Sequence, residues 1–587
     1  MKQLKSPPRW TFFLSYSMEL KKQARTFMTE GLVIDSWETI KKYFVDLSER
    51  DLRTPGDLAK WLQDRSELDA VLEEDAAWRY IRMTIDTRDE ALSETYTFFV
   101  TKIQPELAPY DDILNRKLVD CPFTDELKSD PAYAIYFKAV ETALEIFREE
   151  NIPLEAELNE KSQLFGSISA AQSIEHEGAQ ITMQKAAALL KETDESLRKA
   201  VFEKMSVRRR EDTQKLHDLF SELIDKRHQL SVNAGFENFR DYKFKALNRF
   251  DYTKEDCFNF HQSVKDLIVP IVREIQQERL SKLGKPAFKP WDTEVDPEGK
   301  SPLKPFENGD EMLAGTIAMF HHIDSYFGEC LEKMDEMGHL DLDSKAGKAP
   351  GGYNYPLYEI GVPFIFMNAV GAQRDLVTMV HEGGHAVHSF LSRDLALTGF
   401  KNLPSEVAEL ASMSMELLTM HLWTEFYKDE NNLNRAKKEQ LETVLKILPW
   451  IAQIDEFQHW VYENPSHTIT ERDAKWLELS KAYGTGLTDW AGYEDQLATS
   501  WQRQMHLFEV PFYYIEYGIA QLGALGVWKN SLTNFPKAIE DYKNALRLGY
   551  TRSIPEIYTT AGIKFDFTKD YLKELAQFVS EELQKLK

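Results

Sequence analysis

The chain has 587 residues, 43% of them hydrophobic, so it is long enough to bury a sizeable core. Its 96 acidic and 71 basic residues give a formal net charge of −25, which argues against nucleic acids and anionic membranes as partners because their phosphates would be repelled. The three cysteines, Cys121, Cys257 and Cys330, include no CxxC pair, which favours free thiols in a reducing compartment.

The beginning of the sequence carries no export signal that we recognise. Residues 1–9 are basic, but the apolar run 10–14 that follows is too short for a secretion signal. No segment approaches the length of a membrane span. We therefore expect a cytoplasmic protein without membrane contact, and the sequence leaves its oligomeric state undetermined.

Helical periodicity dominates most of the chain. Apolar residues recur at three- and four-residue spacing over 181–207, 216–230 and 257–280, which predicts long helices. Residues 284–309 interrupt this pattern with proline and glycine, yet they include aromatic residues, so we expect a long ordered excursion. A weaker boundary falls within 165–195.

The expected architecture is mainly α-helical and has two regions. We predict that residues 1–190 form a helical wall of a cleft and that residues 191–587 form the catalytic region.

A short β-structure is predicted directly before the most informative helix. Residues 348–353 are rich in glycine, and the apolar run 362–368 has strand character. An edge strand at this position could bind an extended peptide by strand addition, but a buried strand without a ligand role fits equally well. We expect the following helix to be capped near Asp375.

That helix contains the motif His-Glu-Gly-Gly-His at 381–385. His381 and His385 are four residues apart and share one helix face, so both imidazoles can bind one cation. Glu382 is offset by about 100° and can act as a general base on water near that cation. The helix is apolar on most faces, and its two glycines indicate close approach by substrate or a neighbouring backbone. The alternative is a core helix whose histidines bind carbonyl groups.

A third protein ligand is needed if the metal site is to be tetrahedral with one open position. Residues 404–416 predict a second helix, with Pro404 suited to its first turn. Glu406, Glu409 and Glu416 lie on roughly the same face of this helix. Spacing alone does not choose among them, and a glutamate that does not bind metal could hold a ligand histidine.

An aromatic segment near the C-terminus offers hydrogen-bond donors. It begins with His506, and Pro511 predicts a helix start within it. Tyr514 and Tyr517 would then present two phenols side by side, as an oxyanion formed during peptide hydrolysis requires. The alternative is that these rings only pack in the core.

The two helical motifs together resemble a known group. HEGGHAVH at 381–388, followed by AELASMSMEL at 408–417, resembles the oligoendopeptidase F and thimet oligopeptidase group of zinc metallopeptidases. The Pro-Phe-Tyr segment at 511–513 is more similar to oligoendopeptidase F. The resemblance implies that Glu409 is the third ligand and that His388 is a structural or supporting residue.

The resemblance also bears on the aromatic segment and on the fold. It implies that His506, Tyr514 and Tyr517 stabilise the oxyanion, although the spacing from histidine to tyrosine is one residue shorter than in the thimet type. Val510 stands near the position of a further tyrosine. The resemblance covers the chain from about residue 200 to the end. It implies two helical lobes around a deep channel, with a small β-sheet beside the active-site helix and one Zn²⁺ per chain at the channel floor.

These features predict a zinc-dependent oligoendopeptidase that hydrolyses internal bonds of short unstructured peptides with a metal-activated water. His381, His385 and Glu409 are expected to bind the metal. Three alternatives remain: a helical zinc carboxypeptidase, with Arg374 or Lys348 binding the terminal carboxylate, a dipeptidyl carboxypeptidase, and a non-catalytic helical peptide-binding protein.

Overall fold

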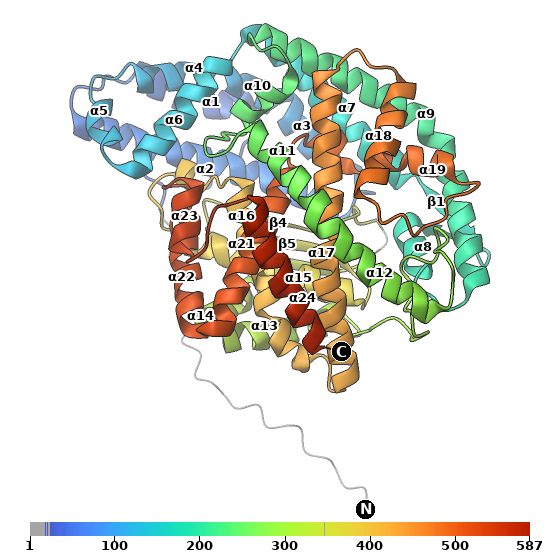
Figure 1. The fold of residues 1–587 in the computed structure, drawn as a ribbon. Coiled ribbons are helices and arrows are strands. Elements are labelled where there is room, and N and C mark those ends of the chain that lie inside the picture. The colour runs from blue at the N-terminus through green and yellow to red at the C-terminus, as the bar shows by residue number, and fades with distance from the viewer. Residues whose placement is uncertain (1–17, 19, 21–23, 346, 587) are drawn as a thin grey trace, which may run out of the picture.

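The computed structural model describes residues 18, 20, 24–345 and 347–586 (Figure 1). The predictions for residues 1–9 and 10–14 therefore lie outside the described residues. Helices make up most of the described chain, which confirms the mainly α-helical class. Within the described ranges, no helix is both long and apolar enough to cross a membrane.

The first lobe protrudes at the upper left of Figure 1. Its elements are α1 (Trp37–Glu49), α2 (Pro55–Ile85), α3 (Glu90–Phe98), the π-helix η1 (Phe99–Ile103), α4 (Gln104–Val119), α5 (Thr124–Lys128) and α6 (Pro131–Ile146). Buried side chains between residues 28 and 140 form its core, which Leu397 and Phe400 from the later chain complete. The two regions of the protein are therefore packed against each other.

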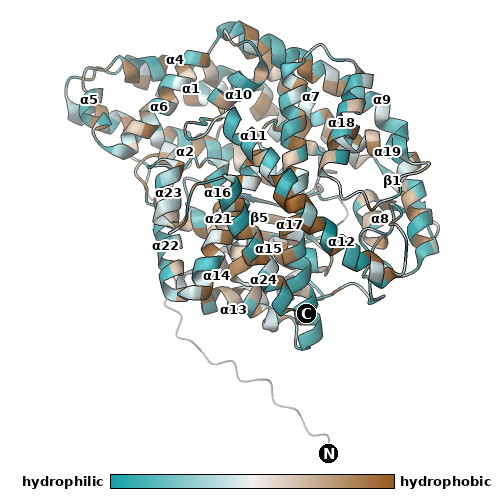
Figure 2. Ribbon diagram, viewed as in Figure 1, coloured by the Kyte–Doolittle hydropathy of each residue, from teal (hydrophilic) through white to brown (hydrophobic). Residues whose placement is uncertain are grey.

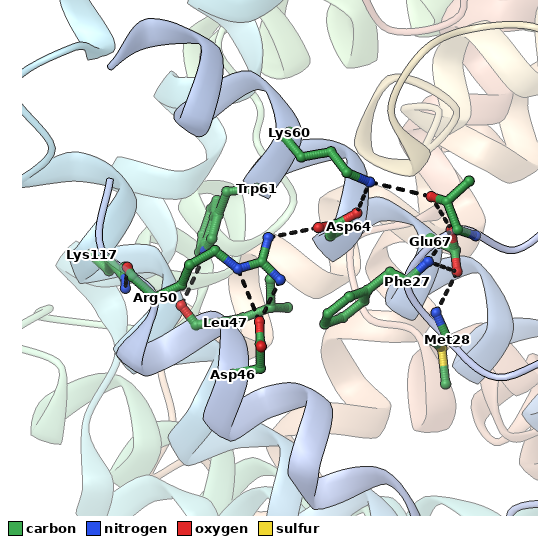
Figure 3. Close-up of polar contacts among 11 residues, drawn as sticks. Phe27, Met28, Asp46, Leu47, Arg50, Lys60, Trp61, Asp64, Glu67 and Lys117 are labelled. Atoms are coloured by element: carbon green, nitrogen blue, oxygen red, sulfur yellow. Dashed lines mark hydrogen bonds and ion pairs between the residues drawn. The ribbon is translucent and has the colours of Figure 1, made fainter. Parts of the chain in front are cut away.

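Polar contacts tie the start of this lobe together (Figure 3). The Glu67 carboxylate accepts hydrogen bonds from the backbone N–H groups of Phe27, at 3.0 Å, and Met28, at 2.7 Å. The indole of Trp61 donates to the carbonyl of Leu47 at 2.8 Å. These bonds fix the first described segment and α1 against α2.

Four helices and a hairpin connect the lobes. They are η2 (Glu149–Asn151), α7 (Ile152–Ala170), β1 (Ser173–His176), β2 (Ala179–Thr182), α8 (Met183–Leu189) and α9 (Glu195–Asn233). The prediction of one helix over 181–207 is wrong, because Asp194 caps a new helix by accepting from the backbone N–H groups of Ser196 and Leu197. From there α9 runs without a break through the predicted segment 216–230.

The remaining elements build the larger region. They are α10 (Phe239–Ala246), α11 (Lys254–Ser263), η3 (Val264–Ile268), α12 (Val269–Leu283), α13 (Gly309–Ile323), α14 (Ser325–Glu336), β3 (Leu340–Asp343), β4 (Tyr353–Tyr355), β5 (Phe364–Ala369), α15 (Gln373–Ser392), η4 (Thr398–Phe400), α16 (Ser405–Leu418), η5 (Met420–Glu425), α17 (Glu430–Glu463), α18 (Ile469–Tyr483), α19 (Glu494–Ala498), η6 (Ser500–Arg503), α20 (Met505–Glu509), α21 (Tyr514–Thr533), α22 (Phe535–Arg547), α23 (Ile554–Thr560) and α24 (Lys569–Lys585). Figure 2 shows hydrophilic residues on the visible face of α22 and hydrophobic residues around α15 and α17 further inside.

The excursion 284–309 is ordered, as predicted. Phe288, Trp291 and Phe306 are buried. Asp292 beside them is fully buried and accepts hydrogen bonds from Arg198, at 2.8 Å, and Lys285, at 2.7 Å. Aromatic anchors and a paired buried charge therefore hold this loop in place.

The small sheet has the strand order β3-β5-β4, with β5 parallel to β3 and antiparallel to β4. The predicted strand 362–368 is thus the central strand, and its apolar residues are covered on both faces. The edge strands are β3 and β4, and in β4 Asn354 lies opposite Ile365. The Asn354 side chain also donates to the backbone carbonyl of Glu382 at 3.3 Å, which joins this edge to α15.

Candidate metal centre

The helix α15 begins where the sequence predicts. The carboxylate of Asp375 accepts from the backbone N–H groups of Val370, at 2.8 Å, and Ala372, at 3.0 Å. These bonds satisfy donors at the helix start that have no partner within the helix. Apolar residues such as Met379 and Val380 are completely buried, so the helix is fixed in the core with its motif towards a cavity.

The two glycines of the motif allow close packing of neighbouring elements. A β-carbon at position 384 would lie 2.7 Å from the Cα of Ser412 and 2.8 Å from the carbonyl oxygen of Ala411, both on α16. A β-carbon at position 383 would lie 2.6 Å from the ring of Phe320 on α13. The close approach predicted for these glycines is therefore to neighbouring protein, which brings α16 within reach of the histidines.

The structure brings His381, His385 and Glu409 together. Oε2 of Glu409 lies 3.4 Å from Nε2 of His381 and 3.7 Å from Nε2 of His385. One ligand atom from each residue lies within 4.8 Å of the other two. Two ligands about 2.0–2.2 Å from a tetrahedral ion are themselves roughly 3.3–3.5 Å apart, so the three side chains fit one cation.

Glu416 and Gln440 orient the first histidine. Nδ1 of His381 lies 2.7 Å from Oε1 of Glu416, whose other oxygen accepts from Gln440 of α17 at 2.8 Å. With Nδ1 donating to the carboxylate, Nε2 of His381 is left with a lone pair directed at the candidate metal position.

Of the three glutamates on α16, only Glu409 faces both imidazoles. It accepts hydrogen bonds from Ser412, at 3.0 Å, and from the hydroxyl of Tyr513, at 2.9 Å. Glu406 instead accepts from Tyr252 at 2.6 Å on another side of the helix. Among the three glutamates that helix spacing could not separate, Glu409 is therefore the one placed beside both histidines.

The acidic groups of the centre differ in their ionisation. Burial raises the pKa of Glu382 to about 7. Burial also opposes the ionisation of Glu409, but the charge of His385 and the hydrogen bond with His381 outweigh it and lower the pKa of Glu409 to about 2. Burial lowers the pKa of His388, which does not belong to the ligand group, to about 3.

The centre lies in a cavity of about 370 Å³ that is lined by His381, Glu382, His385 and Glu409. Gly352 lines this cavity and also a much larger one of about 2420 Å³. Residues of α2, α3, α4, α7 and α9 line the larger cavity together with residues of the catalytic region. The small cavity that holds the candidate metal position therefore adjoins a wide channel between the lobes at Gly352.

The aromatic segment reaches this cavity with a different set of residues from that predicted. Tyr517 and Tyr513 line the small cavity, whereas Tyr514 is not among its lining residues. The Tyr514 side chain lies beside those of Trp450 and Gln504 instead. Sequence reasoning missed Tyr513, whose hydroxyl donates to Glu409.

His506 lies beside these rings. Its Nδ1 is 2.7 Å from Nε2 of Gln504, and its ring centroid is 4.9 Å from that of Tyr514 and 5.8 Å from that of Tyr517. Burial lowers the pKa of His506 to about 4, so the ring is neutral near neutral pH.

The predicted helix start at Pro511 is wrong, because α21 begins at Tyr514. Phe512 has a φ of +67°, a left-handed conformation that breaks the helical path. Its N–H donates to Oε1 of Gln458 at 2.6 Å, and its carbonyl accepts from Arg249. These two bonds from distant parts of the chain hold the turn that directs Tyr513 towards Glu409.

Two histidines from an HExxH helix and a glutamate from the next helix, at the end of a channel, define a metallopeptidase site. The chain matches the sequence model of "Peptidase family M3" over residues 188–577 and that of "Peptidase M3 N-terminal domain" over residues 32–147. The chain therefore belongs to peptidase family M3.

Curated relatives and solved structures agree with this assignment. The chain is 26% identical over 239 residues to an oligoendopeptidase F homolog of Borreliella burgdorferi, in an alignment covering 39% of each chain. It is 25% identical over 262 residues to oligopeptidase PepF of Bacillus subtilis, covering 44% of this chain and 38% of that one. The chain thus spans about two fifths of the length of the curated relatives it matches.

The match to solved structures extends over nearly the whole chain. A structure of PZ peptidase A with an inhibitor superposes with a TM-score of 0.88 at 27% identity, covering 93% of this chain and 97% of that one. Oligoendopeptidase F from Enterococcus faecium shares the fold, with a TM-score of 0.63 at 15% identity over 94% and 97% of the two chains.

Proposed function

We propose that this protein is a zinc-dependent oligoendopeptidase that hydrolyses internal bonds of short, unstructured peptides. The observation that carries the proposal is the convergence of His381, His385 and Glu409 beside a buried glutamate in a channel. These three residues would hold one Zn²⁺, which when bound supplies Lewis acidity and lowers the pKa of water. The names of the curated relatives support the same activity.

Glu382 is the proposed general base. It lies on α15 next to His381 and lines the same cavity as the three ligand residues. In the proposed reaction its carboxylate accepts a proton from the attacking water and then donates a proton to the leaving amine. No covalent intermediate with the protein is needed.

Tyr517 is the proposed donor to the oxyanion. Its ring lines the cavity, and its neighbours His506, Tyr513 and Tyr514 have ring centroids within 5.8 Å of it. We propose that His506 and Tyr514, which the sequence predicts as donors, act by fixing the Tyr517 ring. Tyr513 is proposed to hold Glu409 through its hydrogen bond.

The edge strand β4 is the proposed binding site for the substrate backbone. Gly352, Tyr353 and Asn354 line the small cavity, and β4 pairs with β5 on one side. An extended peptide can therefore pair with the other side of β4 while its scissile bond lies near the metal. The channel favours short unstructured peptides, because a folded domain does not fit a passage of this size.

We also propose a cellular location and a division of the chain into two regions. The first is cytoplasmic residence, which rests on the buried free cysteines Cys121, Cys257 and Cys330. The second is the division into 1–190 and 191–587, which the separate family matches over 32–147 and 188–577 support.

The most direct test is Glu382→Gln. We expect the variant to keep its metal, since no ligand is changed, and to lose activity by a factor on the order of 10⁴ in kcat. Metal analysis and peptide digestion followed by mass spectrometry measure both quantities. Glu478→Gln, at an exposed site on α18, is the matched control and should leave both unchanged. Full turnover in Glu382→Gln would remove this residue from the mechanism.

A peptide blocked at both ends separates the alternatives. An endopeptidase cleaves it at internal bonds, whereas a carboxypeptidase or a dipeptidyl carboxypeptidase needs a free terminal carboxylate. We expect internal cleavage of the blocked peptide. Cleavage limited to the unblocked peptide, in steps of one or two residues, would assign the protein to one of the two rival classes. A metal-loaded chain that cleaves neither peptide would support the non-catalytic alternative.

A further inference from the structure

A second group of potential metal ligands lies outside the proposed active site, where α11 packs against α17. Cys257 and His261 are four residues apart on α11, and Asp455 and His459 are four residues apart on α17. Four-residue spacing places each pair on one helix face. All four side chains are buried, with residue exposures of 2%, 2%, 0% and 1% in the order named.

The ligand atoms of three of these residues converge. One atom each from Cys257, Asp455 and His459 lies within 4.8 Å of the other two. Nε2 of His459 is 3.3 Å from Oδ2 of Asp455, close to the separation of two ligands on one tetrahedral ion. Within the described chain, this is the one such group besides His381, His385 and Glu409.

Three polar atoms of this group lack a hydrogen-bond partner in the described part of the chain, although Nε2 of His459 lies in ion-pair contact with Asp455. Among the described residues, neither ring nitrogen of His459 makes a hydrogen bond, and neither does Oδ1 of Asp455. The rings of Phe244, Phe258 and Phe512 pack around the imidazole at centroid distances of 5.9, 4.9 and 5.4 Å. Buried polar atoms in such apolar surroundings are costly unless they are paired, so the arrangement calls for a partner.

His261 acts on the carboxylate. Its Nε2 lies 2.8 Å from Oδ2 of Asp455, a hydrogen-bond distance. This contact orients Asp455 in the way that outer hydrogen bonds orient the ligands of known metal sites.

We propose that Cys257, Asp455 and His459 bind a structural divalent cation of the zinc class. Thiolate, imidazole and carboxylate are ligands that Zn²⁺ accepts together. Binding requires the Cys257 thiol to release its proton to solvent as the sulfur–metal bond forms. The thiolate and the carboxylate then carry two negative charges that balance the two positive charges of the ion, which suits a buried position.

The ion would join α11 to α17 next to the aromatic turn of the proposed active site, residues 504–517. Gln458, next to His459, accepts the N–H of Phe512, and the Phe512 ring packs on His459. This site therefore supports the turn that carries Tyr513. Loss of the ion is expected to lower the melting temperature of the protein and to leave the ligand helices α15 and α16 in place.

Cobalt reports on this site selectively, because the His381, His385 and Glu409 group contains no sulfur. The full chain is freed of metal with a chelator and titrated with Co²⁺. We expect a thiolate-to-cobalt charge-transfer band that saturates by about two ions per chain, one for each site, and disappears when enough Zn²⁺ is added to fill both sites. Absence of the band in the wild-type chain would overturn the proposal without any variant.

Two cysteine variants assign the band. Cys257→Ala should abolish it, whereas Cys330→Ala, at another buried free cysteine, should retain it. Circular dichroism establishes that each variant is folded, and His459→Gln serves as the second variant if Cys257→Ala does not fold. A band that persists in a folded Cys257→Ala chain would show that another cysteine binds the cobalt, and it would overturn the proposal.

Discussion

The proposed active site joins two regions that are built in different ways. One is the pair of ligand helices, α15 and α16, in which regular spacing and close helix packing set the position of each ligand. The other is the aromatic turn, residues 504–517, which leaves helical geometry at Phe512 and depends on Arg249 and Gln458.

Local sequence is sufficient to place the ligands on the helices, but it is not sufficient to place the tyrosines of the turn. An i, i+4 pair such as His381 and His385 needs only a helix to converge, because 3.6 residues per turn place both on one face. The hydroxyl of Tyr513 reaches Glu409 only because two hydrogen bonds from distant parts of the chain hold the preceding residue in a left-handed turn. Substitutions can disturb one kind of support and leave the other in place.

The largest effect after loss of the general base is expected in the aromatic turn. Tyr517→Phe removes the proposed oxyanion donor, and kcat should fall by a factor of about 10²–10³ while the metal stays bound. Steady-state kinetics with one defined peptide measure this change. Tyr514→Phe is the matched control and should lose less, because Tyr514 does not line the small cavity. Equal losses in the two variants would contradict the separate roles.

The support of the ligand helices is tested by Glu416→Ala. Without the carboxylate that holds Nδ1 of His381, metal affinity should fall by about 10–100-fold. Competition with a chelator of known affinity measures the change. Gln440→Ala leaves Glu416 in place and should cause a smaller loss. Unchanged affinity in Glu416→Ala would mean that helix packing alone fixes the imidazole.

The smallest effect is expected from the contact between the ligand helices. Gly384→Ala forces the backbones of α15 and α16 apart and should cost about 1–3 kcal/mol of unfolding free energy, since packed interiors tolerate extra atoms poorly. Thermal or denaturant unfolding measures it. Gly166→Ala on α7 is the matched control, because its nearest contact of 3.9 Å is ordinary and alanine favours helix. A Gly384→Ala chain as stable as the wild type would show that α16 can shift freely.

Much of the centre could be predicted from sequence. The helix class, the meeting of His381 with His385 and the close approach at the motif glycines follow from local periodicity. Glu409 was chosen over Glu406 and Glu416 by family resemblance, since direction around a helix depends on how that helix packs.

The features that sequence did not predict depend on long-range contacts. Tyr513 lies just before α21, so no helical periodicity predicts where its side chain points. Its partner Glu409 is far away in the sequence, so local sequence does not predict their contact. The run 362–368 reads as a strand, but its central position in the sheet depends on where β3 and β4 pair. The sequence predicts two helical segments, 181–207 and 216–230, where the structure has the single long helix α9, because polar residues within α9 weaken the apolar pattern.

One helix serves both regions of the centre. Gln440 of α17 donates a hydrogen bond to Glu416, which in turn holds His381. Gln458 of the same helix accepts a hydrogen bond from the backbone of Phe512. A shared support of this kind keeps the imidazoles and the phenols aligned with each other. A substitution in α17 can therefore disturb both groups of side chains at once, although none of them belongs to that helix.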